Sequence, residues 1–124
     1  MNGKMRKIIK LNGKEFRTLA NKTLQEAKPL SVQEWAYAMG YGSYSAFRRA
    51  FISYYQLSPS TILRARRLDD IASAILENPE ITMQQVAEQC GFIQACNVRA
   101  FLDRHINMTF NGFKENILMF KEQH

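Results

Sequence analysis

Residues 30–59 read LSVQEWAYAMGYGSYSAFRRAFISYYQLSP, and their pattern returns without a gap at residues 81–110 as ITMQQVAEQCGFIQACNVRAFLDRHINMTF, fifty-one positions later. The two copies place similar residue types at matching positions, as in the pairs Ser31 and Thr82, Glu34 and Gln85, Ala36 and Ala87, Gly40 and Gly91, Phe47 and Val98, Arg48 and Arg99, and Phe51 and Leu102. A pattern repeated at a fixed spacing indicates that the chain builds the same supersecondary unit twice.

Each copy combines a helix start, a glycine turn and a second helix. In the first copy, Ser31 and Glu34 have the spacing of a capping box, in which each side chain bonds to the backbone N–H of the other residue. Gly40 then marks the turn, since glycine adopts positive φ at no steric cost and lets two helices approach closely. A longer helix with apolar residues every three or four positions follows. This order predicts a helix-turn-helix in each copy.

The rest of the chain also has helical patterns, and we predict an all-α fold of about seven helices. The expected helices cover residues 12–27, 31–39, 43–55, 58–77, 82–90, 94–106 and 110–120. The expected organisation is a basic N-terminal arm at 1–12, a first helix-turn-helix lobe at 13–57, a linking helix at 58–77 and a second lobe at 78–124. Ile8, Ile9 and Leu11 leave open a short strand in the arm, as the alternative to a partly disordered tail. Leu76 and Phe120 are expected to face the core from the linking helix and the last helix.

The formal net charge of the 124-residue chain is +6, and the positive charge is concentrated toward the N-terminus. Residues 1–28 carry a net +6 and residues 29–68 a net +4, whereas residues 69–124 carry a net −4. Because nucleic-acid affinity comes largely from the neutralisation of phosphates, we expect the arm and the first lobe to lead in DNA binding. The candidate phosphate contacts in the arm and the linking helix are Lys4, Arg6, Lys7, Lys10, Arg64 and Arg67.

Several other classes of protein are disfavoured by the sequence. No apolar run approaches the ~20 residues of a membrane span, and the N-terminus lacks the apolar core of a secretory signal, so we expect a cytoplasmic protein. Cys90 and Cys96, with only His105 and His124 in the chain, make no zinc pattern, so no metal is expected. His105 is expected in a capping role near a helix end. The sequence offers no glycine-rich phosphate loop, no catalytic carboxylate pair and no nucleophile with a base, so we expect neither enzymatic activity nor a cofactor.

The helix expected at 43–55 has one apolar face and one polar, basic face. An α-helix fits the major groove of DNA, where arginine can bind guanine with two hydrogen bonds and serine can reach a phosphate or a base edge. The residues predicted to contact DNA from this helix are Ser43, Tyr44, Ser45, Arg48 and Arg49. The alternative is that Arg48 and Arg49 only solvate an exposed face.

The equivalent helix of the second copy, at 94–106, offers fewer residues of this kind. Gln94 and Asn97 are candidate adenine readers, and Arg99 can neutralise a phosphate. Two acidic residues, Glu88 and Asp103, lie nearby in the sequence. The alternative here is a repeat that is kept for folding or for contact with another protein.

Three segments resemble the AraC/XylS family of bacterial transcription regulators: Leu-Ser-Pro-Ser at 57–60, Gln-Val-Ala-Glu-Gln-Cys-Gly-Phe at 85–92, and Gly-Tyr-x5-Phe-Arg-Arg-Ala-Phe at 40–51. The resemblance covers about residues 30–114. It implies two helix-turn-helix lobes, joined by a long helix, that insert recognition helices into successive major grooves on one face of the DNA. It also implies the small stand-alone type of regulator, since the chain has no room for an effector-binding domain. The family's arginine in the reading helix is present as Arg49, and its counterpart in the second copy is Ala100.

From the sequence we predict a sequence-specific DNA-binding transcription regulator that binds double-stranded DNA as a monomer, on the nucleoid in the bacterial cytoplasm, with the first lobe dominant. A competing hypothesis is an interaction module whose acidic second lobe contacts RNA polymerase or another regulator, with weak, non-specific DNA binding. The net charge of −4 on residues 69–124 favours this rival for the second half only.

Overall fold

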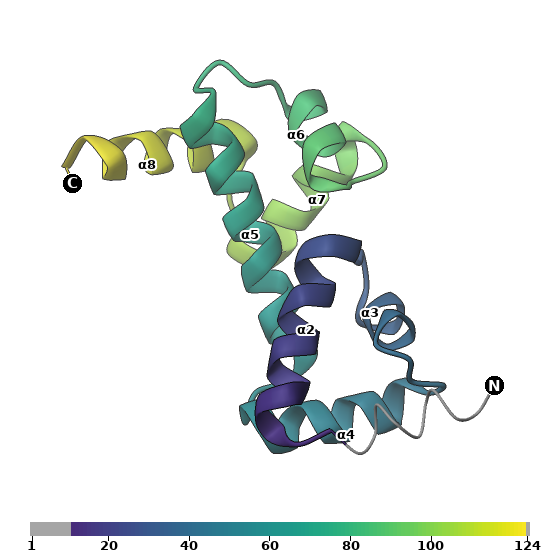
Figure 1. Cartoon of the computed structure of the whole chain (residues 1–124). Helices are drawn as coiled ribbons and strands as arrows, with labels where there is room; N and C mark the ends of the chain where they lie inside the picture. Colours follow the sequence, from purple (N-terminus) through teal and green to yellow (C-terminus); the bar gives the residue numbers. More distant parts are fainter. Residues whose placement is uncertain (1–10, 124) are drawn as a thin grey trace. The chain divides into compact units, whose positions relative to one another are not determined.

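The computed structural model describes residues 11–123, and within that range all regular structure is helical (Figure 1). The seven helices are α2 (Gly13–Ala27), α3 (Val32–Ala38), α4 (Tyr44–Tyr55), α5 (Pro59–Glu77), α6 (Met83–Cys90), α7 (Ala95–Ile106) and α8 (Phe110–Gln123). The predicted all-α fold of about seven helices is therefore confirmed. Within residues 11–123, no helix has both the length and the apolar character needed to cross a membrane. Ile8 and Ile9, two of the three residues of the alternative strand in the arm, lie outside the described residues.

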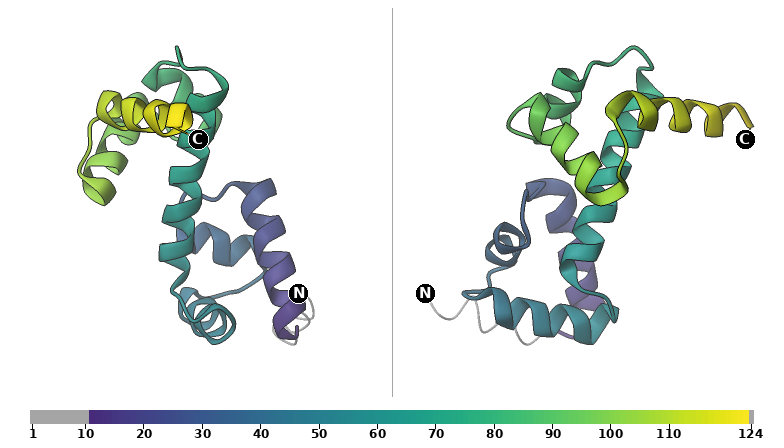
Figure 2. Two further views of the ribbon diagram at one scale, coloured as in Figure 1. Left: turned by 90° about the vertical axis from the view of Figure 1, so that its left-hand side faces the viewer. Right: turned by 180° about the vertical axis from the view of Figure 1, so that it is seen from behind.

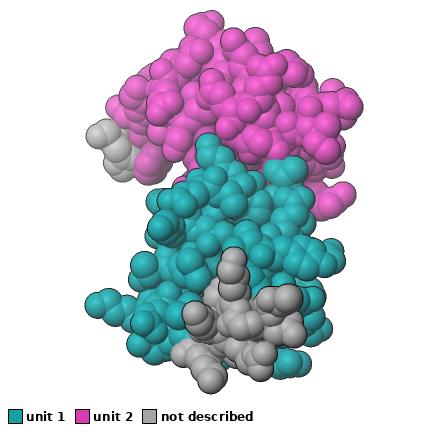
Figure 3. Space-filling view, turned by 45° about the vertical axis from the view of Figure 1, so that its right-hand side comes forward, with its two compact units in different colours: residues 1–63 teal, residues 64–124 magenta. Residues whose placement is uncertain are grey.

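The described chain divides into two compact units, which Figure 3 colours separately. The first unit ends at Leu63 and the second begins at Arg64, so the boundary falls within α5. The first turns of α5 belong to the first unit, and the rest of the helix belongs to the second. The linking helix is thus a structural part of both units.

The first unit has an aromatic core between α2, α3 and α4. Figures 1 and 2 show that α4 crosses the N-terminal end of α2. The ring of Phe16 lies 6.2 Å from that of Phe47 and 6.1 Å from that of Phe51, and Trp35 lies 5.1 Å from Phe51. The Trp35 Nε1 donates a hydrogen bond of 3.3 Å to the Ala20 carbonyl, which satisfies its one polar group inside the core. Each fully buried ring stabilises this unit by about 1.5–3 kcal/mol through removal of its surface from water.

The second unit has a mainly aliphatic core. Its buried residues come from α5, α6, α7, the start of α8 and the segment before α6, and they are Ile71, Ala74, Ile75, Ile81, Val86, Ala87, Val98, Leu102 and Phe110. The Lys114 Nζ donates a hydrogen bond of 3.1 Å to the Ile81 carbonyl, so α8 is tied by a polar contact to the segment that leads into α6.

The glycine turn has the same hydrogen bond in both units. Gly40 has φ 90° and Gly91 has φ 82°, the left-handed conformation that favours glycine. Directly after it, the Tyr41 N–H donates to the Ala36 carbonyl at 2.9 Å. In the second unit the Phe92 N–H donates at 2.9 Å to the carbonyl of Ala87, fifty-one positions after Ala36. The repeated sequence is therefore a repeated helix-turn-helix backbone.

The helix starts before these turns are also matched. The Ser31 Oγ accepts a hydrogen bond of 3.1 Å from the Glu34 N–H, and the Thr82 Oγ1 accepts one of 3.1 Å from the Gln85 N–H. In the second unit the Gln85 side chain also accepts from the Thr82 N–H, at 2.9 Å, which completes the capping box. The first unit lacks this second half of the box, because the Glu34 Oε1 accepts from the Leu30 N–H instead, at 3.1 Å. The side-chain cap on the backbone is thus the same in both units.

The repeat extends further toward the N-terminus than the sequence suggests. A shift of fifty-one positions places Phe16 on Arg67, Ala20 on Ile71, and Leu24 on Ile75. Except for Arg67, which is partly exposed, these residues are buried. The α5 segment after Leu63 therefore supplies buried core residues to the second unit, as α2 supplies them to the first. Each unit is a helix, a helix-turn-helix, and the start of a further helix.

Two expectations about the core were wrong. Leu76 is 38% exposed and Phe120 is 63% exposed. On α5 the buried side is set by Ile71 and Ile75, and Leu76 is rotated about 100° from Ile75 around the helix. On α8, Phe113, Ile117 and Leu118 pack against the core from partly buried positions, whereas Phe120 is largely exposed. Apolar periodicity predicts a helix face, but it does not show where along the helix the core ends.

Candidate nucleic-acid interface

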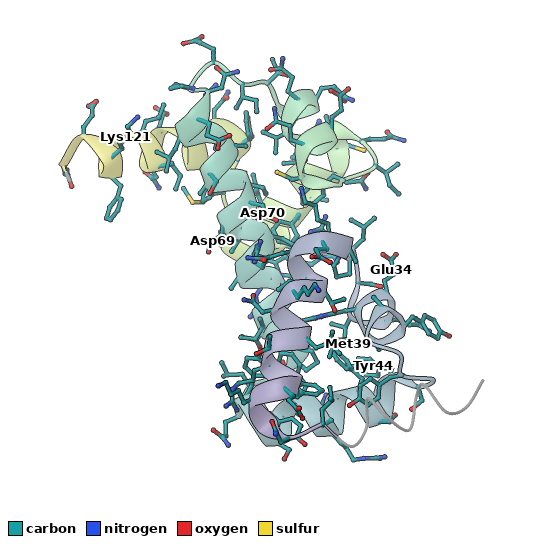
Figure 4. All side chains as sticks on the ribbon, viewed as in Figure 1. Glu34, Met39, Tyr44, Asp69, Asp70 and Lys121 are labelled. Carbon is teal, nitrogen blue, oxygen red and sulfur yellow. The ribbon has the colours of Figure 1, made fainter. Side chains whose placement is uncertain are left out.

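The predicted reading helix of the first unit, α4, is fixed by its apolar side. Phe47 and Phe51 are fully buried, which leaves the opposite side of α4 in solvent. Ser43 caps the helix, because its Oγ accepts a hydrogen bond of 3.1 Å from the Ala46 N–H. The hydroxyl hydrogen of Ser43 can still donate to a phosphate. Tyr44, 43% exposed, lies at the N-terminal end of α4 (Figure 4).

The two arginines of α4 follow on the same exposed side. Ser45, Arg48 and Arg49 are all exposed, as predicted for DNA contacts, and α4 contains no acidic residue. Among the described residues, no carboxylate lies within ion-pair distance of Arg48 or Arg49. Each guanidinium has five N–H donors and no acceptor. The structure therefore places two unneutralised guanidinium groups on one rigid helix.

Two of the residues predicted to contact DNA from α7, Gln94 and Asn97, already form hydrogen bonds at the start of this helix. The Asn97 Oδ1 accepts a hydrogen bond of 3.0 Å from the Gln94 N–H, and the Cys96 thiol donates to the Gln94 Oε1 at 3.6 Å. A bidentate contact with adenine needs both the oxygen and the NH₂ group of a carboxamide. Asn97 would have to share or give up its cap to make that contact. Arg99 is exposed and does not have this constraint.

Of the two candidate phosphate contacts on α5, Arg64 is exposed and Arg67 is partly covered. The Arg67 guanidinium lies over the ring of Phe92, 3.9 Å from its centroid, and 5.3 Å from the centroid of Phe101. This cation–π contact was not predicted. The only sequence pattern that indicates this contact is the extended repeat. In it Arg67 occupies the position of Phe16, whose ring packs against Tyr41, the residue after the first glycine turn.

His105 belongs to the same group of side chains. Its ring packs edge-on against Phe101, with 4.6 Å between the centroids. Burial lowers the pKa of the His105 imidazole below its usual range, and the positive charges of Arg64, Arg104 and Arg67 lower that pKa further. The sequence predicts a capping role for His105, but it does not predict the aromatic and basic groups that surround the imidazole.

The remaining predicted contacts are in the arm. Lys4, Arg6, Lys7 and Lys10 lie outside the described residues. No protein-family model, curated protein or solved structure matches the chain.

Proposed function

We propose that the chain is a sequence-specific DNA-binding transcription regulator in which α4 of the first unit is the principal reading helix. The observation that carries this proposal is the pair of exposed arginines, Arg48 and Arg49, on a helix whose other side is anchored by Phe47 and Phe51. A helix anchored in this way points the side chains of both arginines away from the core. The major groove admits one α-helix, and bidentate contact of arginine with the O6 and N7 atoms of guanine is its commonest specific contact.

The duplicated helix-turn-helix supports two reading positions on one polypeptide. On this proposal the chain belongs with the AraC/XylS-like regulators, whose motifs it resembles at residues 40–51 and 85–92. It binds as a monomer, with α4 in one major groove and α7 in the next. The net +4 of residues 29–68 supports stronger attraction to phosphate at the first unit than at the second.

The test is the variant Arg49→Ala, with Lys22→Ala as a control that removes one exposed charge of the first unit from α2 instead. Specific duplexes are first selected from a random-sequence pool. We expect Arg49→Ala to weaken binding to them by about 1–3 kcal/mol, and to flatten the preference at one base pair. Lys22→Ala should not change base preference. Equal losses on selected and random duplexes for Arg49→Ala would contradict base reading by this residue.

A second candidate function is favoured by the net −4 of residues 69–124. In this proposal the second unit contacts RNA polymerase or another regulator, and DNA binding is weak and non-specific. It predicts that selection from random duplexes yields no defined sequence, while purified bacterial RNA polymerase binds the chain. A defined sequence retained against competitor DNA decides for the first function.

A further inference from the structure

The exposed side of α7 carries apolar and small side chains where a solvent-facing helix ordinarily carries polar ones. Cys96 and Ala100 are both exposed, and each lies two positions from the buried Val98, which is a rotation of about 200° around the helix. Ile93 directly precedes the Gln94 cap of α7. It is 77% exposed, the largest fraction for a large apolar side chain among residues 11–123. We call Ile93, Cys96 and Ala100 the apolar stripe of α7.

The first unit has no such stripe on its reading helix. The equivalent positions, fifty-one residues earlier, are Gly42, Ser45 and Arg49. Ala100 thus stands where α4 has an arginine, and Cys96 where α4 has a serine. At these positions α7 presents carbon and sulfur, whereas α4 presents hydroxyl and guanidinium groups. The two helices hold the same place in their repeats but offer different chemistry.

Basic side chains stand on both sides of the apolar stripe. Arg99 immediately precedes Ala100 and Arg104 follows it by four positions, so the two exposed arginines lie on opposite sides of Ala100 around the helix. The one acidic residue of α7, Asp103, lies in its C-terminal half, and the N-terminal half has none. An apolar stripe flanked by positive charges is complementary to the major groove, where the C5-methyl groups of thymine lie between two phosphate backbones.

The size of the apolar stripe fits the edge of a base better than the surface of a protein. A stable protein interface buries about 800 Å² on each partner, whereas two of the three side chains of the stripe, Cys96 and Ala100, are small. Small side chains allow the helix backbone to come close to the floor of the groove. A thymine methyl is a single carbon atom, and alanine is one of the residues that contact it.

We propose that the apolar stripe of α7 reads thymine through its C5-methyl group, with Ile93 and Ala100 as the residues that determine this specificity. This inference rests on the proposed function, and it gives α7 a base preference of a different kind from that of α4. Helix α4 selects guanine by hydrogen bonds, and α7 selects thymine by apolar contact. The N-terminal part of a recognition helix is the part that contacts base edges, and the stripe lies there.

The experiment uses the full chain, the variant Ile93→Ala and the control Met119→Ala. Met119 is 57% exposed and lies on α8, so the control removes an exposed apolar side chain of the same unit away from α7. A duplex selected from a random-sequence pool is remade with uracil in place of each thymine in turn. Uracil keeps the base pair and the O4 acceptor and lacks only the methyl group. Fluorescence anisotropy measures the affinity of each chain for each duplex, and thermal unfolding checks that each chain is folded.

We expect uracil to weaken binding of the unaltered chain about fourfold at one or two positions, about 10 bp from the base pair that Arg49 reads. At the position that Ile93 contacts, the same exchange should leave the affinity of Ile93→Ala unchanged, because this variant has already lost the contact. Met119→Ala should keep the full response to uracil. A second variant, Ala100→Arg, restores the residue type of the equivalent position in α4. A new selection with it should replace thymine by guanine at one position.

The outcomes that contradict the proposal differ from one another. If the chain selects a defined sequence but no uracil exchange in the α7 segment weakens binding, the proposal is overturned. It is also overturned if uracil weakens the unaltered chain and Ile93→Ala equally and Ala100→Arg selects the same sequence as before, because the methyl then acts through the shape of the duplex. If Ile93→Ala keeps every DNA affinity but loses binding to purified bacterial RNA polymerase, the stripe is a protein contact instead. If the unaltered chain selects no defined sequence at all, the proposed function fails, and this inference fails with it.

Discussion

Phe16 in the first unit and Arg67 in the second occupy the same position of the repeat, and they fill it in different ways. Phe16 is fully buried against Tyr41, Phe47 and Phe51. Arg67 lays its guanidinium over Phe92, the equivalent of Tyr41, and remains partly exposed. Both units nonetheless keep the same glycine turn. The helix-turn-helix backbone thus tolerates either residue, and the choice decides whether the position adds to the core or carries charge to the surface.

The two candidate reading helices differ in a related way. Helix α4 offers Arg48 and Arg49 and has no acidic residue. Helix α7 offers Arg99, includes Asp103, and uses Asn97 to hold its own start. On the proposed function, α4 therefore offers more groups for contact with bases than α7 does.

The largest expected difference between the units is in stability. Phe16→Ala removes a fully buried ring and should lower the free energy of unfolding of the first unit by about 3–5 kcal/mol. Arg67→Ala removes a partly exposed cation–π contact and should cost the second unit about 0.5–2 kcal/mol. Trp35, the single tryptophan, reports the first unit by fluorescence, and hydrogen exchange reports the second. Equal costs would show that Arg67 is as much a core residue as Phe16.

The next comparison is in DNA affinity. The double variant Arg48→Ala with Arg49→Ala should weaken specific binding more than the triple variant Gln94→Ala, Asn97→Ala and Arg99→Ala. Each lost bidentate base contact is worth about 1–3 kcal/mol, and α7 has fewer groups able to make one. Fluorescence anisotropy on a selected duplex measures both. Because Asn97 also caps α7, thermal unfolding must show that the triple variant is folded. A larger loss from the triple variant would reverse the assignment of the two helices.

A smaller loss of stability, equal in the two units, is expected when the helix caps that they share are removed. Ser31→Ala and Thr82→Ala each remove a helix cap and should each lower the free energy of unfolding of their own unit by about 1 kcal/mol. Aspartate at either position accepts the same hydrogen bond, so Ser31→Asp and Thr82→Asp should restore most of the loss. Denaturant titration of the six chains, including the unaltered one and a double alanine variant, checks this. A clearly larger loss in one unit would show that its cap also supports tertiary contacts.

The smallest effect concerns pH and is confined to the second unit. The pKa of His105 is lowered in the folded chain, so below the ordinary imidazole pKa of about 6.5 the unfolded chain binds more protons than the folded one. Stability of the second unit should fall as pH drops from that value toward the lower folded pKa. His105→Gln should remove this component, and the first unit, which has no histidine, should not show it. Unfolding measured between pH 7.5 and 5 tests it. An unchanged pH profile in His105→Gln would contradict the lowered pKa of His105 that its burial and the charges of Arg64, Arg104 and Arg67 produce.

The helices, their caps and their turns were determined by the sequence itself. Ser31, Thr82, Gly40 and Gly91 act within about five residues of their own positions, so spacing along the chain is enough to predict them. The exposed arginines of α4 follow from the same periodicity, because the buried positions of a helix leave the others outward. The cap formed by Asn97 is equally local and could have been predicted from its place three residues after Gln94.

The tertiary structure decided what depends on residues far apart in the chain. Arg67 meets Phe92 across twenty-five positions, and no local pattern distinguishes it from the exposed Arg64. The partial burial of His105 among basic groups and the exposure of Phe120 have the same origin: they depend on which helices pack together and where their shared core ends. Hydrogen bonds within a helix depend on neighbours, whereas burial and electrostatic fields depend on all the elements that surround a group.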